Sequence, residues 1–250
     1  MSKEALLIFQ KNPVKGFVKT RLAATLGDEL ALSIYEFLLG KTFEEAEQIP
    51  QNKVVFFSHF LPKDHPFPDQ FLHLQKGIDL GEKMDNAFQK VFSMGYQKAV
   101  IIGTDCPELT ADLLIEAFRK LDQSDLVIGP AADGGYYLLG MKSTHSSLFQ
   151  GIEWSSSQVF SRTLEIANHH KLSFSLLPVL HDIDEEEDWK PHHLQTTPAP
   201  HQQHHAGDSY TGDQIRVIKM ADTTTITTTT KTQAQISKHC GTTQPCNASK

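Results

Sequence analysis

The stretch AVIIGTDCPELTADLLIEAFRKL, residues 99–121, decides the fold class of this chain. Its first five residues form a short apolar run that ends in a glycine, which is typical of a buried strand. Residues 111–121 carry apolar side chains at helical spacing, and Thr110 is a suitable N-cap for that helix. A strand, a short polar loop and an amphipathic helix in succession are the repeating unit of an α/β protein.

The same alternation continues on both sides of this stretch. Short apolar runs predict further strands, at residues 5–9, 54–57, 126–129, 136–141 and 172–179. Helical spacing predicts helices, at residues 28–47, 84–92 and 157–168. Three prolines predict a loop over residues 61–71. Strands that alternate with helices indicate a Rossmann-like, mostly parallel sheet with helices on both faces.

Composition divides the chain near residue 195. Hydrophobic residues make up 39% of the whole, but large apolar side chains almost vanish from residue 195 onward, where Thr, Gln, His and Ser dominate. Such a segment cannot bury enough apolar surface to offset its ordering entropy. The sequence therefore predicts one α/β domain at residues 1–194 and a low-complexity, disordered tail at residues 195–250.

The charge and the cysteine content exclude several classes of protein. The formal net charge is −7, and residues 1–194 hold 18 basic and 27 acidic side chains, which disfavours a nucleic-acid partner. The N-terminal apolar run of five residues is too short for a signal-peptide core or a membrane span. The domain has a single cysteine, Cys106, which we expect to be a small buried residue rather than a nucleophile. We therefore expect a cytoplasmic protein with no membrane partner.

Cations gather after the first predicted strand, in KNPVKGFVKTRL at residues 11–22, and they are Lys11, Lys15, Lys19 and Arg21. Gly16 permits backbone conformations that turn amide N–H groups toward an anion, and the cations add compensating charge. This combination fits a di- or triphosphate, although its spacing is not that of a Walker A loop. A solvated basic loop at a helix entry is the alternative interpretation.

Aspartates follow three of the predicted strands, and in such sheets ligands bind beyond the carboxyl ends of the strands. Asp105 directly follows a buried strand and is well placed to hold Mg²⁺ or Mn²⁺. Asp182 and Asp184 follow the last strand, and Asp184 could supply a second ligand. Asp133 precedes two glycines and could bind a sugar or act as a base. Each aspartate also has an alternative, structural interpretation. Asp105 could cap a turn, Asp133 could belong to a hairpin turn, and Asp184 could lie at the solvated start of a helix.

Taken in order, these stretches resemble one family. The motifs are FxKxPxxGxVKTRL, QxGxDLGxxM, GTDCPxLT, GPAxDGGYYLLG, a tryptophan–serine segment and DIDxxED. They are similar to those of the rSAM/selenodomain-associated transferases, glycosyltransferases with the nucleotide-diphospho-sugar transferase fold of the glycosyltransferase-A type. That family is akin to molybdenum-cofactor guanylyltransferase and phospholactate guanylyltransferase. The resemblance covers residues 5–190 and leaves the tail outside.

The resemblance implies a role for each motif. The residues that would face the nucleotide phosphates are Lys11, Gly16, Lys19 and Arg21. The residues of the 75–81 loop that would approach the base and ribose are Gln75, Gly77, Leu80 and Gly81. Mg²⁺ or Mn²⁺ would be held by Asp105 and Asp184. The acceptor or sugar side would be shaped by Asp133, Gly134, Gly135 and Trp154, and catalysis would fall to Asp133, Lys19 and Arg21.

One departure from the family lies in DIDEEED, where Glu185 and Glu186 replace the usual Thr-Pro, which predicts a looser turn around Asp184. Three functions remain open from the sequence. The first is a glycosyltransferase that acts from a nucleotide-diphospho-sugar on a small-molecule acceptor. The second is a nucleotidyltransferase that joins a nucleoside triphosphate to a phosphorylated acceptor, which four loop cations fit slightly better. The third is a nucleotide-binding protein without catalytic activity.

Overall fold

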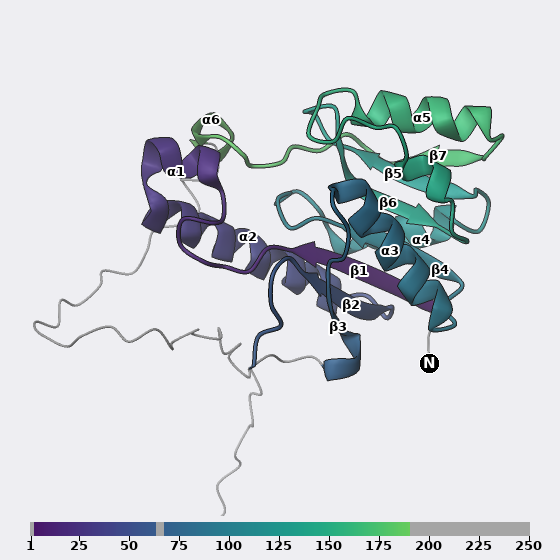
Figure 1. Ribbon diagram of the computed structural model, residues 1–250, viewed down its shortest axis with the longest axis horizontal. Coiled ribbons are helices and arrows are strands. Elements are labelled where there is room, and N and C mark those ends of the chain that lie inside the picture. The colour runs from purple at the N-terminus through teal and green to yellow at the C-terminus, as the bar shows by residue number, and fades with distance from the viewer. Residues whose placement is uncertain (1–2, 64–67, 191–250) are drawn as a thin grey trace, which may run out of the picture. The chain divides into compact units, whose positions relative to one another are not determined.

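Seven strands form one mixed sheet in the computed structural model, which describes residues 3–63 and 68–190 (Figure 1). The predicted tail at residues 195–250 lies outside the described residues. The strands are β1 Glu4–Gln10, β2 Asn52–Phe57, β3 Leu72–Leu74, β4 Lys98–Ile102, β5 Leu126–Pro130, β6 Tyr136–Met141 and β7 Phe174–Leu176. Their spatial order is β3-β2-β1-β4-β6-β5-β7. The mostly parallel α/β fold expected from the sequence is confirmed.

Strand β6 departs from the expectation of a parallel sheet. It pairs antiparallel with β4 and with β5, whereas the other neighbouring strands pair in parallel. Only residues 131–135 separate β5 from β6. A parallel connection needs a crossover of a dozen or more residues, so this short link can only reverse the chain.

The helices are α1 Thr20–Leu26, α2 Asp28–Glu47, α3 Leu80–Ser93, α4 Ala111–Lys120, α5 Val159–His169 and α6 Glu186–Trp189, with short 3₁₀ turns η1 Asp69–Phe71 and η2 Ser146–Phe149. Helix α4 begins as predicted, because the Thr110 side chain accepts a hydrogen bond from the Leu113 N–H at 3.4 Å. Within the two described ranges, no helix combines the length and the apolar character that crossing a membrane requires.

The helices cover both faces of the sheet (Figure 1). Successive side chains of a strand point to opposite faces, and β1 shows this directly. Ala5 and Leu7 belong to the core on the side of α3, whereas Leu6 and Ile8 belong to the core on the side of α4. Burial on both faces explains why the central strands read as unbroken apolar runs.

The acidic segment after β7 is anchored by its two apolar residues. Ile183 and Trp189 are buried in a small cluster with side chains of α1 and α2, and the Trp189 ring meets the Phe37 ring edge-on at 5.7 Å. The predicted loosening of this turn is wrong. Glu185 and Asp188 form a capping box, and the Asp188 carboxylate accepts from the Asp184 and Glu185 N–H groups at 3.0 and 2.8 Å.

Candidate functional site

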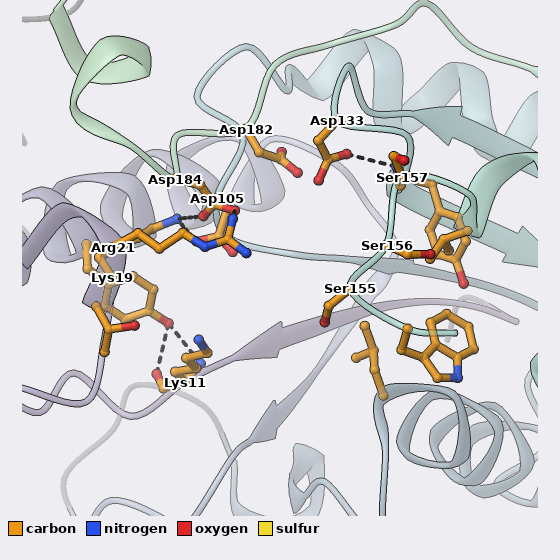
Figure 2. A pocket seen from close by; sticks show the side chains of 17 residues that line it. Lys11, Lys19, Arg21, Asp105, Asp133, Ser155, Ser156, Ser157, Asp182 and Asp184 are labelled. Carbon is orange, nitrogen blue, oxygen red and sulfur yellow. Dashed lines mark hydrogen bonds and ion pairs between the residues drawn. The ribbon is translucent and has the colours of Figure 1, made fainter. Parts of the chain in front are cut away.

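A pocket of about 610 Å³ opens at the carboxyl edge of the sheet (Figure 2). Its walls come from the loops after β1, β4 and β5, from the start of α1, and from the segments 154–157 and 182–184. Its charged lining residues are Lys11, Lys19, Arg21, Asp105, Asp133, Asp182 and Asp184. The fold therefore brings together side chains that lie more than 160 positions apart in the sequence.

Lys19 forms the centre of the ionic network in this pocket. Its ammonium lies 2.6 Å from an Asp105 carboxylate oxygen and 3.0 Å from an Asp184 oxygen, and it donates to the Ile183 carbonyl. The Lys19 side chain is only 5% exposed, whereas both carboxylates are close to half exposed. Burial lowers its pKa, but the two carboxylates outweigh that effect, so the net shift is upward. Lys19 is therefore a charged, buried cation held between two acids.

The backbone of Lys19 is also unusual. Its φ of 47° lies in the left-handed region, where a residue with a Cβ is strained by about 1–2 kcal/mol. Ser155, on the opposite wall of the pocket, has a φ of 67° and shares this strain. Strained backbone of this kind clusters at functional sites, where the surrounding contacts hold it in place.

Asp182 is a pocket residue that the assignment of roles from the sequence left out. In Figure 2 it lies between Asp184 and Asp133. Burial, followed by the charges of Asp105, Asp133 and Asp184, raises the pKa of Asp182 to about 7. The spacing held a signal, since side chains two positions apart on extended backbone point the same way. Asp182 and Asp184 flank the buried Ile183 and both line the pocket.

Two of the acids fit a divalent cation. The Asp105 and Asp184 carboxylates both reach the Lys19 ammonium, so they converge on one point of the pocket. Their loops are joined by a hydrogen bond from the Ile183 N–H to the Asp105 carbonyl at 2.9 Å. Among the described residues, no group of three or more His, Cys, Asp or Glu side chains is arranged to hold a metal ion. Two carboxylates suit Mg²⁺, which completes its shell with water and substrate phosphates.

Lys11 and Arg21 bring positive charge to the pocket from opposite ends of the first loop (Figure 2). The Lys11 backbone is fixed by the buried Tyr35 of α2, whose hydroxyl accepts from the Lys11 N–H at 2.8 Å and donates to its carbonyl at 2.9 Å. Arg21 lies 3.8 Å from Asp184 and remains largely exposed. Both side chains therefore add positive charge to the lining of the outer pocket.

The middle of the same loop lies away from the pocket. Lys15 pairs with Glu29 at 2.6 Å, and neither Lys15 nor Gly16 belongs to the pocket lining. Gly16 has a φ of 80°, and the turn closes through a hydrogen bond from the Phe17 N–H to the Val14 carbonyl. The glycine thus serves the turn. Three of the loop's four cations, Lys15, Lys19 and Arg21, lie within ion-pair distance of carboxylates of the protein itself, and the Arg21 contact is the longest at 3.8 Å.

A second, more apolar pocket of about 280 Å³ adjoins the first and shares Lys11, Tyr35 and Leu80 with it. Gln75 lines this inner pocket and donates to the Gln10 and Phe56 carbonyls, each at 3.1 Å. Gln10 is buried, lines the same pocket, and its side-chain oxygen has no hydrogen-bond partner within the described residues. The structure thus places two of the four loop residues, Gln75 and Leu80, at the inner pocket.

The other two loop residues, Gly77 and Gly81, act through close packing. A Cβ on Gly77 would lie 2.7 Å from the Lys83 backbone nitrogen, and one on Gly81 would lie 2.5 Å from the Trp154 ring. Neither glycine belongs to the lining of the two pockets. Gly81 lets the start of α3 approach Trp154, which itself forms part of the outer pocket wall.

The expected sugar side of the site is also assembled. Asp133 and Gly135 line the outer pocket with Trp154, and the Asp133 carboxylate accepts from the Gly135 N–H at 2.8 Å. Gly134 has a φ of 91°, and a Cβ there would clash with the Ser157 carbonyl. This contact holds the β5–β6 turn against the serines at 155–157, which sequence reasoning noted only as a segment.

Cys106 is buried at the wall of the inner pocket, and burial raises the pKa of its thiol to about 12. A thiol with so high a pKa is almost entirely protonated at neutral pH and makes a poor nucleophile. The expected burial of Cys106 is confirmed, and its raised pKa is consistent with the predicted lack of a nucleophilic role.

This strand order, with an acidic and basic pocket at the carboxyl edge, is the fold of nucleotide-diphospho-sugar transferases. A crystal structure from Desulfovibrio desulfuricans G20, described as a "putative nucleotide-diphospho-sugar transferase", matches with a TM-score of 0.67 and 33% identity. The match covers 74% of this chain and 84% of the Desulfovibrio chain. At this identity and coverage, the chain belongs to the same family as the Desulfovibrio protein.

Other comparisons give weaker or shorter matches. Residues 49–156 match the family model described as "Uncharacterized protein conserved in bacteria (DUF2064)". The crystal structure of Rv0371c from Mycobacterium tuberculosis H37Rv matches with a TM-score of 0.50 and 11% identity, over 78% of this chain and all of that one. A complex of that Mycobacterium protein with manganese aligns with a TM-score of 0.47 and 13% identity, over 77% of this chain and 98% of that one. No curated protein gives a significant match.

Proposed function

We propose that this chain is a metal-dependent transferase that uses a nucleotide-activated donor, and that the donor is a nucleotide-diphospho-sugar. The observation that supports this best is the convergence of Asp105 and Asp184 on one cationic atom at 2.6 and 3.0 Å, beside Arg21. The description of the Desulfovibrio relative, at 33% identity, supports the same class of donor.

Each part of the site has a role in this proposal. Mg²⁺ or Mn²⁺ held by Asp105 and Asp184 would offset negative charge on the departing diphosphate. Lys11 and Arg21 bind phosphate oxygens, while Lys19 keeps the two metal-binding carboxylates together. The inner pocket, with Gln75 and Leu80, receives the base and ribose. The remaining wall, formed by Asp133 and Trp154, faces the sugar and the acceptor.

The transfer breaks the bond between the anomeric carbon of the sugar and the diphosphate oxygen. An acceptor hydroxyl forms the new carbon–oxygen bond, its proton passes to the Asp133 carboxylate, and the nucleoside diphosphate leaves with the bonding electrons. Arg21 stabilises the charge that develops on that leaving group. The contribution of the protein is mainly positioning and electrostatic stabilisation.

Nucleotidyl transfer from a triphosphate is the competing reaction. The sequence favoured it slightly, because the first loop carries four cations. In the structure, Lys15 pairs with Glu29, Lys19 with Asp105 and Asp184, and the exposed Arg21 lies 3.8 Å from Asp184. Lys11 is then the one loop cation that forms no ion pair with a described carboxylate, so less positive charge is free for phosphates than the loop sequence suggests. This smaller positive charge supports the diphosphate donor.

Product analysis tests the proposal. The protein is incubated with Mn²⁺, a panel of small alcohols and sugar phosphates as acceptors, and either nucleotide-sugars or nucleoside triphosphates. We expect release of nucleoside diphosphate from a nucleotide-sugar, abolished by Asp133→Asn. Pyrophosphate release from a triphosphate, with no reaction of any nucleotide-sugar, would show that the enzyme is a nucleotidyltransferase instead.

A further inference from the structure

A third pocket, of about 380 Å³, lies between the edge strand β3 and helix α3. It shares no lining residue with the two pockets of the candidate site. Its floor is apolar and includes Phe56, Leu72 and Ala87, all of which are buried. The volume falls in the range of small-molecule sites, about 300–1,000 Å³. It is therefore large enough for a compact ligand.

The rim of this pocket is cationic. Lys76, Lys83 and Lys90 line it, and no acidic residue is among the described lining residues. Lys83 and Lys90 are seven positions apart, which places them two turns apart on the same side of α3. Within the described part of the chain, none of these three lysines forms an ion pair. By contrast, Lys15, Lys19 and Lys98 each pair with a carboxylate.

The pKa of His73, which lines the same pocket, responds to the positive charges of these lysines. Burial lowers its pKa, and the charges of Lys90 and Lys76 lower it further. Its Nε2 atom is buried and has no hydrogen-bond partner among the described residues. The His73 ring lies 5.4 Å from the Phe56 ring that forms part of the floor. The lysines thus surround a neutral, apolar surface, although the whole chain carries a net charge of −7.

An uncompensated cationic rim over an apolar floor selects a particular kind of ligand. Anions are attracted to unpaired lysines, and the attraction is strongest where little water separates the charges. An apolar body of the same molecule would cover the floor and gain from leaving water. We propose that the β3–α3 pocket binds a small amphipathic anion, whose carboxylate, phosphate or sulfonate lies among Lys76, Lys83 and Lys90 and whose apolar part rests on Phe56 and Leu72.

The test uses 1-anilinonaphthalene-8-sulfonate, a dye with one anionic group on an aromatic body that fluoresces in apolar surroundings. The full chain is titrated with the dye under native conditions, and the double variant Lys83→Glu/Lys90→Glu is compared with it. We expect saturable binding by the wild type and at least a tenfold rise in Kd for the variant. The milder Lys83→Gln/Lys90→Gln pair should give a smaller rise in the same direction.

The matched control is Lys41→Glu/Lys120→Glu, which changes the net charge equally on the exposed Lys41 of α2 and the half-buried Lys120 of α4, both outside the third pocket. This control should bind the dye like the wild type. A second control, Arg21→Glu, detects any dye bound in the candidate active site, and it should also bind the dye like the wild type. The proposal fails if the wild type does not bind the dye, if Lys83→Glu/Lys90→Glu binds it unchanged, or if the control pair weakens binding equally. Circular dichroism confirms that each variant is folded.

Discussion

Lys19 joins the first loop, the strand end at Asp105 and the acidic segment at Asp184 through a single ammonium group. Because its side chain is almost fully buried, the two carboxylates would be left facing each other without it. Lys19→Met keeps much of the apolar stem and removes the charge. We expect it to lower the free energy of unfolding by about 2 kcal/mol, since the carboxylates remain partly solvated. Urea unfolding in EDTA measures the change.

The matched control is Lys15→Met, which breaks the exposed pair with Glu29 in the same loop. Exposed pairs contribute little, so this variant should unfold like the wild type. If both variants have the same stability, Lys19 does not organise the acids of the pocket.

Asp182 should make stability depend on pH. Its pKa is raised to about 7 by burial and by Asp105, Asp133 and Asp184, whereas its ordinary value is 3.8. Between about pH 4 and 7 the native state therefore holds a proton that the unfolded state has released. Stability must then fall as the pH rises through this window, by up to about 1.4 kcal/mol per pH unit. Above pH 7 this contribution is constant.

Asp182→Asn removes that titration. We expect the stability of the variant relative to the wild type to increase from pH 4 to 7 and to level off above pH 7. Urea unfolding in EDTA at pH 4.5, 5.5, 6.5 and 8 measures it. A difference that is the same at every pH would show that Asp182 is charged throughout.

The residues of the site were only partly predictable from the sequence. Asp105 and Asp184 could be assigned to one edge of the sheet, because each follows a strand. The pairing of Lys15 with Glu29, and the burial of Lys19 between two acids, could not be predicted. Such contacts depend on how α1 and α2 pack, and spacing within a single loop does not encode that.

At the scale of elements, the direction of a strand was harder to predict than its position in the sequence. Helix α2 spans Asp28–Glu47, as its apolar spacing indicated, and β6 spans Tyr136–Met141. The direction of β6 was missed because a strand's own pattern does not encode its direction. The signal lay in the five-residue connection from β5, which is too short for a crossover helix. Strand β3 has three residues and offers too short an apolar run to detect.

The turn between β5 and β6 should be sensitive to a single methyl group. A Cβ on Gly134 would clash with the Ser157 carbonyl, and the Gly134 carbonyl accepts from the Phe160 N–H at the start of α5. Gly134→Ala should therefore lower the free energy of unfolding by about 1–3 kcal/mol beyond the cost of its backbone conformation. Thermal and urea unfolding measure this change.

Gly95 provides the control, because its φ of 93° matches the 91° of Gly134 and open space surrounds it. Gly95→Ala should cost about 1–2 kcal/mol, the strain of a left-handed residue alone. Equal losses in the two variants would mean that the 155–157 segment is not packed against the turn.

At the scale of the whole molecule, the proposed function requires an acidic chain to bind an anionic ligand. Four carboxylates line the outer pocket; burial, and then repulsion from the other three, raises the pKa of Asp182. These carboxylates would repel a polyphosphate entering the pocket, and an accompanying metal ion would add to the positive charge of Lys11 and Arg21 in offsetting that repulsion. The charge distribution of the pocket thus adds support to the proposed metal dependence.

The composition of residues 195–250 predicts that this segment contributes nothing to the free energy of unfolding of the domain. A chain that ends at residue 194 should keep the melting temperature of the full chain, within about 2 °C, and its affinity for nucleotides. Differential scanning calorimetry compares the two chains. A clearly lower melting temperature for the shortened chain would show that the tail packs on the domain.

The most direct test of the proposed function is the affinity for nucleoside diphosphates, measured by isothermal titration calorimetry in Mn²⁺ and in EDTA. The panel covers UDP, GDP, CDP and ADP, with the wild type and Asp105→Asn. For the nucleotide that binds, we expect Mn²⁺ to lower the Kd of the wild type at least tenfold and to have little effect on Asp105→Asn. Equal affinity in Mn²⁺ and EDTA, or a full Mn²⁺ effect in Asp105→Asn, would contradict a metal-assisted phosphate site at Asp105.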